Sequence, residues 1–87
     1  MENTLDGNAA GGILGAIFPV DMTLAQATCA GCGATNAVGA VVVYAHGMGT
    51  VLRCPACDTV LMRITHAGER YWLDVRGIQV LQLRMEV

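Results

Sequence analysis

The chain has 87 residues, five arginines, no lysine and seven carboxylates, which gives a formal net charge of −2. This length fits one small domain, and the weakly acidic charge has the wrong sign for a protein that binds nucleic acid by neutralising phosphates. Crossing a bilayer takes about 20 apolar residues, and the longest apolar stretch, Ala9 to Val20, has twelve and contains Pro19. The first residues lack the basic segment of a secretory signal, so we expect a cytoplasmic protein without a membrane span.

The first predicted element is a short N-terminal helix. We expect residues 1–7 to form a flexible N-terminus and residues 8–87 a single domain that begins with a helix over 8–18. Asp6 or Asn8 could cap this helix. Its apolar residues fall on one stripe, formed by Ile13, Leu14, Ile17 and Phe18. Three glycines weaken the helix, so the stripe must dock either on the domain's own sheet or on a partner.

The rest of the chain shows the pattern of antiparallel β-structure, with turns at His46–Gly49 and His66–Glu69. Gly77 predicts a bulge or bend before the last strand. Strands are predicted at Leu24–Thr28, Val38–Tyr44, Thr50–Arg53, Val60–Thr65, Arg70–Arg76 and Ile78–Met85. We therefore expect a mainly β fold: antiparallel hairpins hung from two cysteine-bearing turns, with a short N-terminal helix.

In the strand over Arg70–Arg76, apolar and polar residues alternate, as expected for a strand with two different faces. One face would carry Tyr71, Leu73 and Val75, and the other Trp72, Asp74 and Arg76.

All the cysteines fall into two pairs with two residues between their members, and 21 residues separate the pairs: Cys29, Cys32, Cys54 and Cys57. This pattern is typical of a zinc site with four thiolate ligands, although the separation is slightly longer than usual. Four cysteines close the tetrahedral coordination sphere, which makes such a site structural. Gly31, Gly33 and Pro55 suit the tight turns that aim two sulfurs at one metal. Iron in the same site, two disulfides, or a redox switch are the alternatives.

These pairs carry a family resemblance. Cys29-Ala-Gly-Cys-Gly and Cys54-Pro-Ala-Cys-Asp resemble the knuckles of a zinc ribbon. Together with Leu5-Asp-Gly-Asn-Ala and Trp72-Leu-Asp-Val-Arg-Gly, they look like a family of small actinobacterial proteins known only as a domain of unknown function. The resemblance implies a zinc-ribbon fold with one Zn²⁺ on the four cysteines, and it transfers no activity.

We expect no catalytic residue and no enzyme. Asp58 follows the last cysteine and is predicted to be a turn residue or an acceptor near the metal. His46 and His66 lie in hairpin turns, too far from the cysteines to bind the same metal. The pairs also resemble those of rubredoxin, an iron electron carrier, but Asp58 replaces the usual glycine and aromatic residues are few.

The high hydrophobic fraction of 54% favours a role in protein–protein association, as an accessory subunit, an adaptor or a homo-oligomer. Nucleic-acid binding is the alternative. It would use Arg63 and Arg76 beside Trp72, which could act as a stacking platform.

Overall fold

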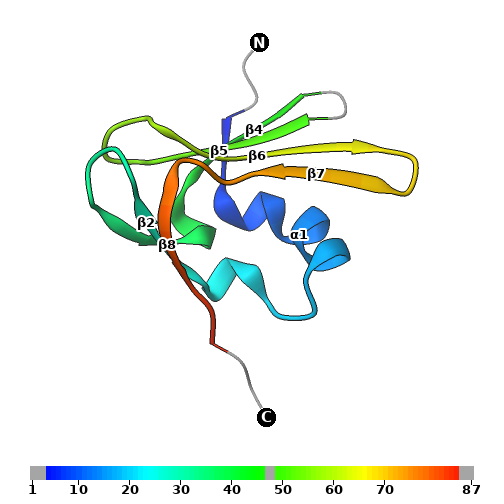
Figure 1. The fold of residues 1–87 in the computed structure, drawn as a ribbon, viewed down its shortest axis with the longest axis horizontal. Coiled ribbons are helices and arrows are strands. Elements are labelled where there is room, and N and C mark those ends of the chain that lie inside the picture. The colour runs from blue at the N-terminus through cyan, green and yellow to red at the C-terminus, as the bar shows by residue number, and fades with distance from the viewer. Residues whose placement is uncertain (1–3, 47–48, 85–87) are drawn as a thin grey trace.

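The computed structural model describes residues 4–46 and 49–84 of the chain. It shows a mainly β fold with two antiparallel sheets and one short α-helix (Figure 1). The elements in chain order are β1 Thr4–Asp6, η1 Gly7–Ala10, α1 Gly11–Ile17, η2 Met22–Leu24, β2 Gln26–Cys29, β3 Thr35–Ala37, η3 Val38–Ala40, β4 Val42–His46, β5 Gly49–Arg53, β6 Val60–Ala67, β7 Arg70–Asp74 and β8 Ile78–Gln82, where η marks a 3-10 helix. The predicted fold class is confirmed.

The larger sheet has five strands in the order β1-β4-β5-β6-β7. The predicted hairpins form its middle and one edge, as β4 with β5 and β6 with β7. Side chains alternate between its two faces, as period-2 strands require. Its inner face carries a row of cross-strand neighbours: Val43, Leu52 and Met62, with Ile64 two residues further along β6.

The helical segments pack beneath this inner face (Figure 1). Leu14 is fully buried in the core, and Ile13, Ile17 and Phe18 pack against the core. The predicted stripe therefore docks on the domain's own sheet. The α-helix begins later than predicted, because a 3-10 turn occupies Gly7–Ala10. Ala10 takes the cap position of α1 without a side-chain hydrogen bond. The side chains of Asp6 and Asn8, the predicted caps, lie outside what the structure describes.

The second sheet joins segments that are distant in sequence. It has the order β3-β2-β8, so the C-terminal strand lies beside the strand that delivers the first cysteine. The chain crosses into this sheet through a turn at Gly77, where a bend was predicted. Gly77 is buried, and a Cβ added to it would lie only 1.8 Å from the carbonyl oxygen of Val60.

Several boundaries differ from the predictions. Residues 4–6 of the expected flexible N-terminus form β1, which pairs with β4. Residues 38–40 form a 3-10 turn instead of the start of a strand, and the short strand β3 before them was not predicted. Gly47 and Met48, at the centre of the first predicted turn, lie outside the described residues, as does Met85 at the end of the last predicted strand.

Candidate metal centre

The first cysteine pair lies in a tight turn at the end of β2. The backbone N–H of Cys29 donates to the carbonyl of Ala34, and the N–H of Gly33 donates to the carbonyl of Cys29. Inside this loop the N–H of Gly31 points at Cys29 Sγ, at 3.3 Å. Gly33 has a φ of +78°, a conformation that glycine adopts without steric cost. We call this turn, residues 29–34, the first knuckle.

The second pair repeats this geometry at the end of β5. Cys54 N–H donates to the carbonyl of Thr59, Asp58 N–H donates to the carbonyl of Cys54, and Ala56 N–H lies 3.4 Å from Cys54 Sγ. Asp58 occupies the position of Gly33 and has a φ of +66°, which aspartate tolerates better than most residues. Residues 54–59 are the second knuckle, and the prediction that Asp58 is a turn residue is confirmed.

The two knuckles bring all four sulfur atoms together. Every Sγ lies within 4.8 Å of the others, and two distances across the knuckles, Cys29 to Cys57 and Cys32 to Cys54, are both 3.7 Å. A disulfide requires about 2.05 Å between the sulfurs. A tetrahedral ion with metal–sulfur bonds of about 2.3 Å requires about 3.75 Å. The cluster could therefore coordinate one metal ion tetrahedrally.

The electrostatics of the cluster favour thiolates at particular positions. Burial by itself would raise the pKa of Cys29, but the backbone N–H groups of Cys32 and Gly31 lower it to about 6. The hydroxyl and N–H of Thr59 lower the pKa of Cys57. The N–H of Ala34 acts to lower the pKa of Cys32, but the neighbouring sulfurs outweigh it and raise this pKa to about 12. The Cys29 and Cys57 sulfurs thus favour the thiolate form in which cysteine binds a cation, whereas Cys32 without a metal favours the thiol.

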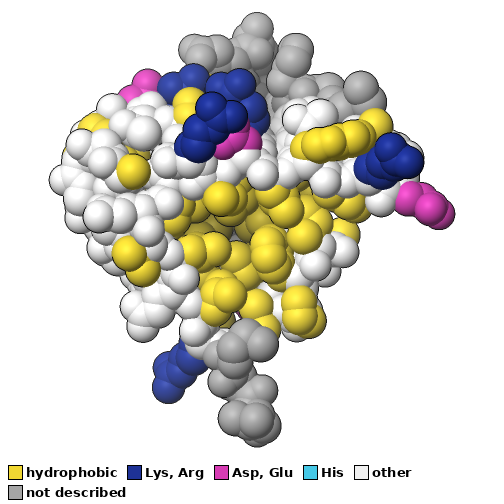
Figure 2. Space-filling model, in the orientation of Figure 1, with side chains coloured by type: hydrophobic (Ala, Val, Ile, Leu, Met, Phe, Trp, Pro, Cys, Tyr) yellow, Lys and Arg dark blue, Asp and Glu magenta, His cyan; other side chains and the backbone are white. Residues whose placement is uncertain are grey.

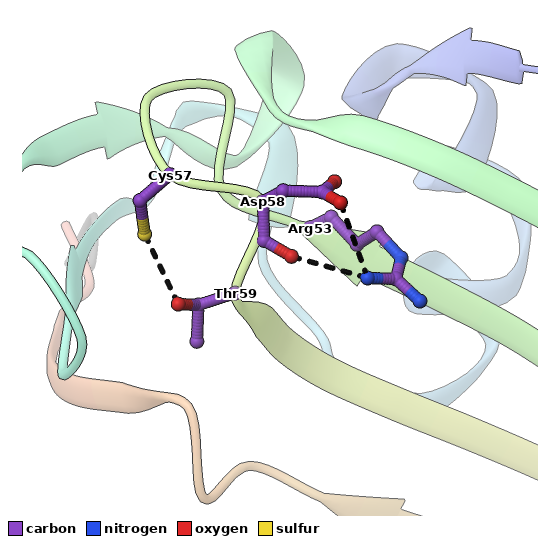
Figure 3. A network of polar contacts seen from close by, with 4 residues as sticks. All are labelled: Arg53, Cys57, Asp58 and Thr59. Carbon is purple, nitrogen blue, oxygen red and sulfur yellow. Dashed lines mark hydrogen bonds and ion pairs between the residues drawn. The ribbon is translucent and has the colours of Figure 1, made fainter.

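A polar network braces the second knuckle (Figure 3). The hydroxyl of Thr59 lies 3.0 Å from Cys57 Sγ. On the other side, the guanidinium of Arg53 donates to the Asp58 carbonyl at 3.1 Å and lies 3.5 Å from its carboxylate. The guanidinium also lies over the ring of Tyr44, 5.5 Å from its centre. These contacts hold the left-handed residue Asp58 and the last cysteine in place.

Two glycines let the parts of the site approach one another. A Cβ on Gly31 would lie 2.5 Å from Thr59 Oγ1, so only glycine lets the first knuckle come this close to the second. The carbonyl of Gly77 accepts a hydrogen bond from Ala30 N–H, which ties the first knuckle to the turn between the sheets. The roles of Thr59, Arg53 and Gly77 at the site were not predicted, because they depend on contacts between distant segments.

The other residues considered from the sequence lie in separate places. His66 belongs to β6, where its Nε2 lies 2.7 Å from the carbonyl of Gly68 and its ring stacks on Tyr71. The backbone of His46 ends β4. His66 does not belong to the cysteine cluster, which is the group of possible metal ligands found among the described residues. The side chain of His46 lies outside what the structure describes.

The fold and the cluster define the chain as a small, mainly antiparallel β protein with four cysteines placed to bind one metal ion. More particularly, the chain belongs to a family of unknown function (DUF6510), whose family model matches residues 1–86. Comparison with curated proteins gave no match, and comparison with solved structures gave none either. No helix within the described ranges is long and apolar enough to cross a bilayer.

Proposed function

We propose that the protein is a non-catalytic module folded around one structural Zn²⁺ and acting through protein–protein association. The observation that carries the metal assignment is the cluster of four sulfurs with tetrahedral spacing across two equivalent knuckles. Zinc suits four thiolates in a closed tetrahedral site. Such an ion would cross-link β2 to β5, and it has no open position for a substrate.

The sequence outside the four cysteines favours zinc over iron as the bound metal. Rubredoxin-like carriers pack several aromatic residues near the metal, and this chain has four in all. The aspartate at position 58 is a weaker argument against iron, because it adopts the positive φ that a glycine would take there. The two metals are distinguished directly, since a ferric tetrathiolate protein is red and a zinc protein is colourless.

The association role is supported by apolar side chains that the fold leaves uncovered. Hydrophobic side chains gather over the middle of one face, between β7, α1 and β8 (Figure 2). Leu24 is 71% exposed, and other large apolar side chains are also exposed: Tyr71, Trp72, Leu73, Val75, Val80 and Leu83. Exposed apolar surface of this extent favours a partner.

The metal assignment is tested by metal analysis and thermal unfolding of the purified chain. We expect one zinc per chain, and we expect Cys54→Ser or a strong chelator to unfold the domain, because metal-binding free energy is folding free energy in such sites. Ala56→Ser is the matched control: it puts the same side chain at an exposed position between two ligands, so it should keep both zinc and melting temperature. A near-native circular dichroism spectrum after complete zinc removal would contradict the proposal.

The association role is tested by affinity purification from the native host with the zinc-loaded protein. We expect a protein in stoichiometric amount, either another chain or further copies of this one. A monomer that retains no protein would count against this role.

Nucleic-acid binding is a second candidate because Arg63 and Arg76 line the same surface depression as Trp72, as the sequence predicted. Against it, Arg76 already pairs with Asp74 at 3.1 Å, which places a carboxylate in the middle of this surface. Retention on single-stranded RNA or DNA at low salt that weakens as salt rises would favour this candidate.

A further inference from the structure

The edge strand β7 exposes three large apolar side chains in a row. It ends the five-stranded sheet, and within the described part of the chain β6 is the one strand that pairs with it. Trp72 is 52% exposed, and Tyr71 and Leu73 on the opposite face are 37% and 39% exposed. Natural edge strands are usually protected by proline, lysine or a bulge, because unpaired backbone groups can recruit another strand. The sequence of β7, Arg-Tyr-Trp-Leu-Asp, has no such protection.

The phase of the hairpin determines which backbone groups of β7 face outward. Gly68, with a φ of +61°, and Glu69 form a two-residue turn closed by the pair Ala67 and Arg70. Hydrogen-bonded and non-hydrogen-bonded pairs alternate from that closing pair. The backbone groups of Arg70, Trp72 and Asp74 therefore point to β6. Those of Tyr71 and Leu73 point to the open edge.

This phase makes β7 complementary to itself. An antiparallel copy centred on Trp72 sets Tyr71 against Leu73 of the second copy, so the outward N–H and C=O groups of both residues meet as a hydrogen-bonded pair. The two Trp72 residues then form the non-hydrogen-bonded pair on the two-fold axis, where side chains are closest. Arg70 of each copy lies opposite Asp74 of the other.

The opposite charges at the two ends of β7 distinguish it from the other edge strands, and they favour this register over shifted ones. Registers shifted by one pair would set Arg70 against Trp72, or Asp74 against Trp72, and would lose both opposite-charge pairs. The other edge strands among residues 4–46 and 49–84 are β1, β3 and β8, and none of them carries opposite charges at its two ends. The backbone N–H and guanidinium of Arg76 hold the pKa of Asp74 below its usual value, so this carboxylate stays charged at neutral pH.

We propose that β7 is a homodimer interface, in which β7 of two copies pair antiparallel about Trp72 and join two five-stranded sheets into one. A two-fold interface uses the same patch on both copies, and the self-complementary strand meets that requirement. The inference rests on the association role proposed above, and it names the partner as a second copy of this chain. The apolar residues Tyr71, Trp72 and Leu73 would supply its centre, and the two ion pairs its ends.

The test exchanges the charges at the strand ends of the full, zinc-loaded chain. Arg70→Asp and Asp74→Arg each replace two attractive pairs by two repulsive ones, so we expect each variant to dimerise about tenfold more weakly, or worse, than the wild type. Sedimentation equilibrium measures the dissociation constants. Mixing the two variants restores two opposite-charge pairs, so native mass spectrometry of the mixture should show a heterodimer in excess over both homodimers.

Two further variants control for damage to the monomer. Asp74→Arg also removes the partner of Arg76, so the double variant Arg70→Asp with Asp74→Arg is included, and it should dimerise like the wild type. Gln79→Asp changes an exposed residue of the edge strand β8, and it should leave the dimer unchanged.

The proposal is overturned by a wild-type chain that stays monomeric to concentrations on the order of 1 mM. It is also overturned by a dimer that neither charge exchange weakens, because that dimer would use another surface. Neither result touches the metal centre, which metal analysis tests separately. A monomer that binds a different protein would leave the association role standing without this interface.

Discussion

At the scale of single residues, the two knuckles match in their backbone hydrogen bonds but differ in one side chain. Thr59 closes the second knuckle and places its hydroxyl 3.0 Å from Cys57 Sγ. The equivalent residue of the first knuckle is Ala34, which has no hydroxyl. The second knuckle therefore has a hydrogen-bond donor to sulfur beyond those of the backbone.

We expect Thr59→Val to weaken zinc binding about tenfold, because hydrogen bonds to metal ligands tune affinity by about 10- to 100-fold. The shape of the residue is kept, so the fold should be unchanged. Competition with a chromophoric chelator measures the affinity. Thr35→Val is the control: it removes a hydroxyl that contacts Thr28 at 2.9 Å instead of a sulfur. Equal affinities in both variants and the wild type would show that the hydroxyl has no role at the metal.

At the scale of elements, α1 is held by packing and not by its own propensity. Its seven residues include three glycines and no side-chain cap, and helices this short are not stable alone. What keeps it in place is the burial of Leu14, with Ile13 and Ile17 packed against the core. The apolar stripe was readable from the sequence, whereas the surface it covers was not.

Replacing a helix glycine where space allows should stabilise the protein. A Cβ on Gly15 would meet no atom within 4 Å, so Gly15→Ala should raise the free energy of unfolding by about 0.5–1 kcal/mol. Gly33→Ala makes the same change where space is also open but φ is +78°, and it should lower that free energy by about 1–2 kcal/mol. Urea unfolding of both variants gives the two values. Shifts of the same sign would contradict this explanation.

At the scale of the whole molecule, Gly77 connects both sheets and the metal centre. It is buried where the chain passes from β7 to β8, and its carbonyl accepts the N–H of Ala30 in the first knuckle. The close approach of the Val60 carbonyl leaves no room for a side chain. The position of sheet β3-β2-β8 against the larger sheet thus depends on one glycine.

Gly77→Ala should therefore lower the free energy of unfolding by about 3 kcal/mol or more, since the methyl group would force backbone atoms apart. The melting temperature of the zinc-loaded variant measures this. Gly12→Ala serves as the control, because a Cβ there meets no atom within 4 Å. A melting temperature for Gly77→Ala equal to that of the wild type would contradict the role given to Gly77.

The sequence by itself determined the local features of this protein. The cysteine spacing identified all four members of the cluster, because two residues between cysteines set the turn that aims both sulfurs the same way. Alternation identified the β4–β5 and β6–β7 hairpins, because the side chains of a strand have a period of two. It also put Leu73 and Trp72 on opposite faces of β7, where they lie.

Only the tertiary structure decided which distant segments meet. The pairing of β1 with β4 and of β8 with β2 depends on backbone hydrogen bonds, which leave little trace in the pattern of side chains. The contact of Thr59 with Gly31, and the bracing of Asp58 by Arg53, follow from the way the two knuckles face each other. The sequence carries a strong local signal for the turn at each cysteine pair. The sequence contains no signal that β7 lies at the edge of the sheet, because the edge position of a strand depends on which other strands pair with it.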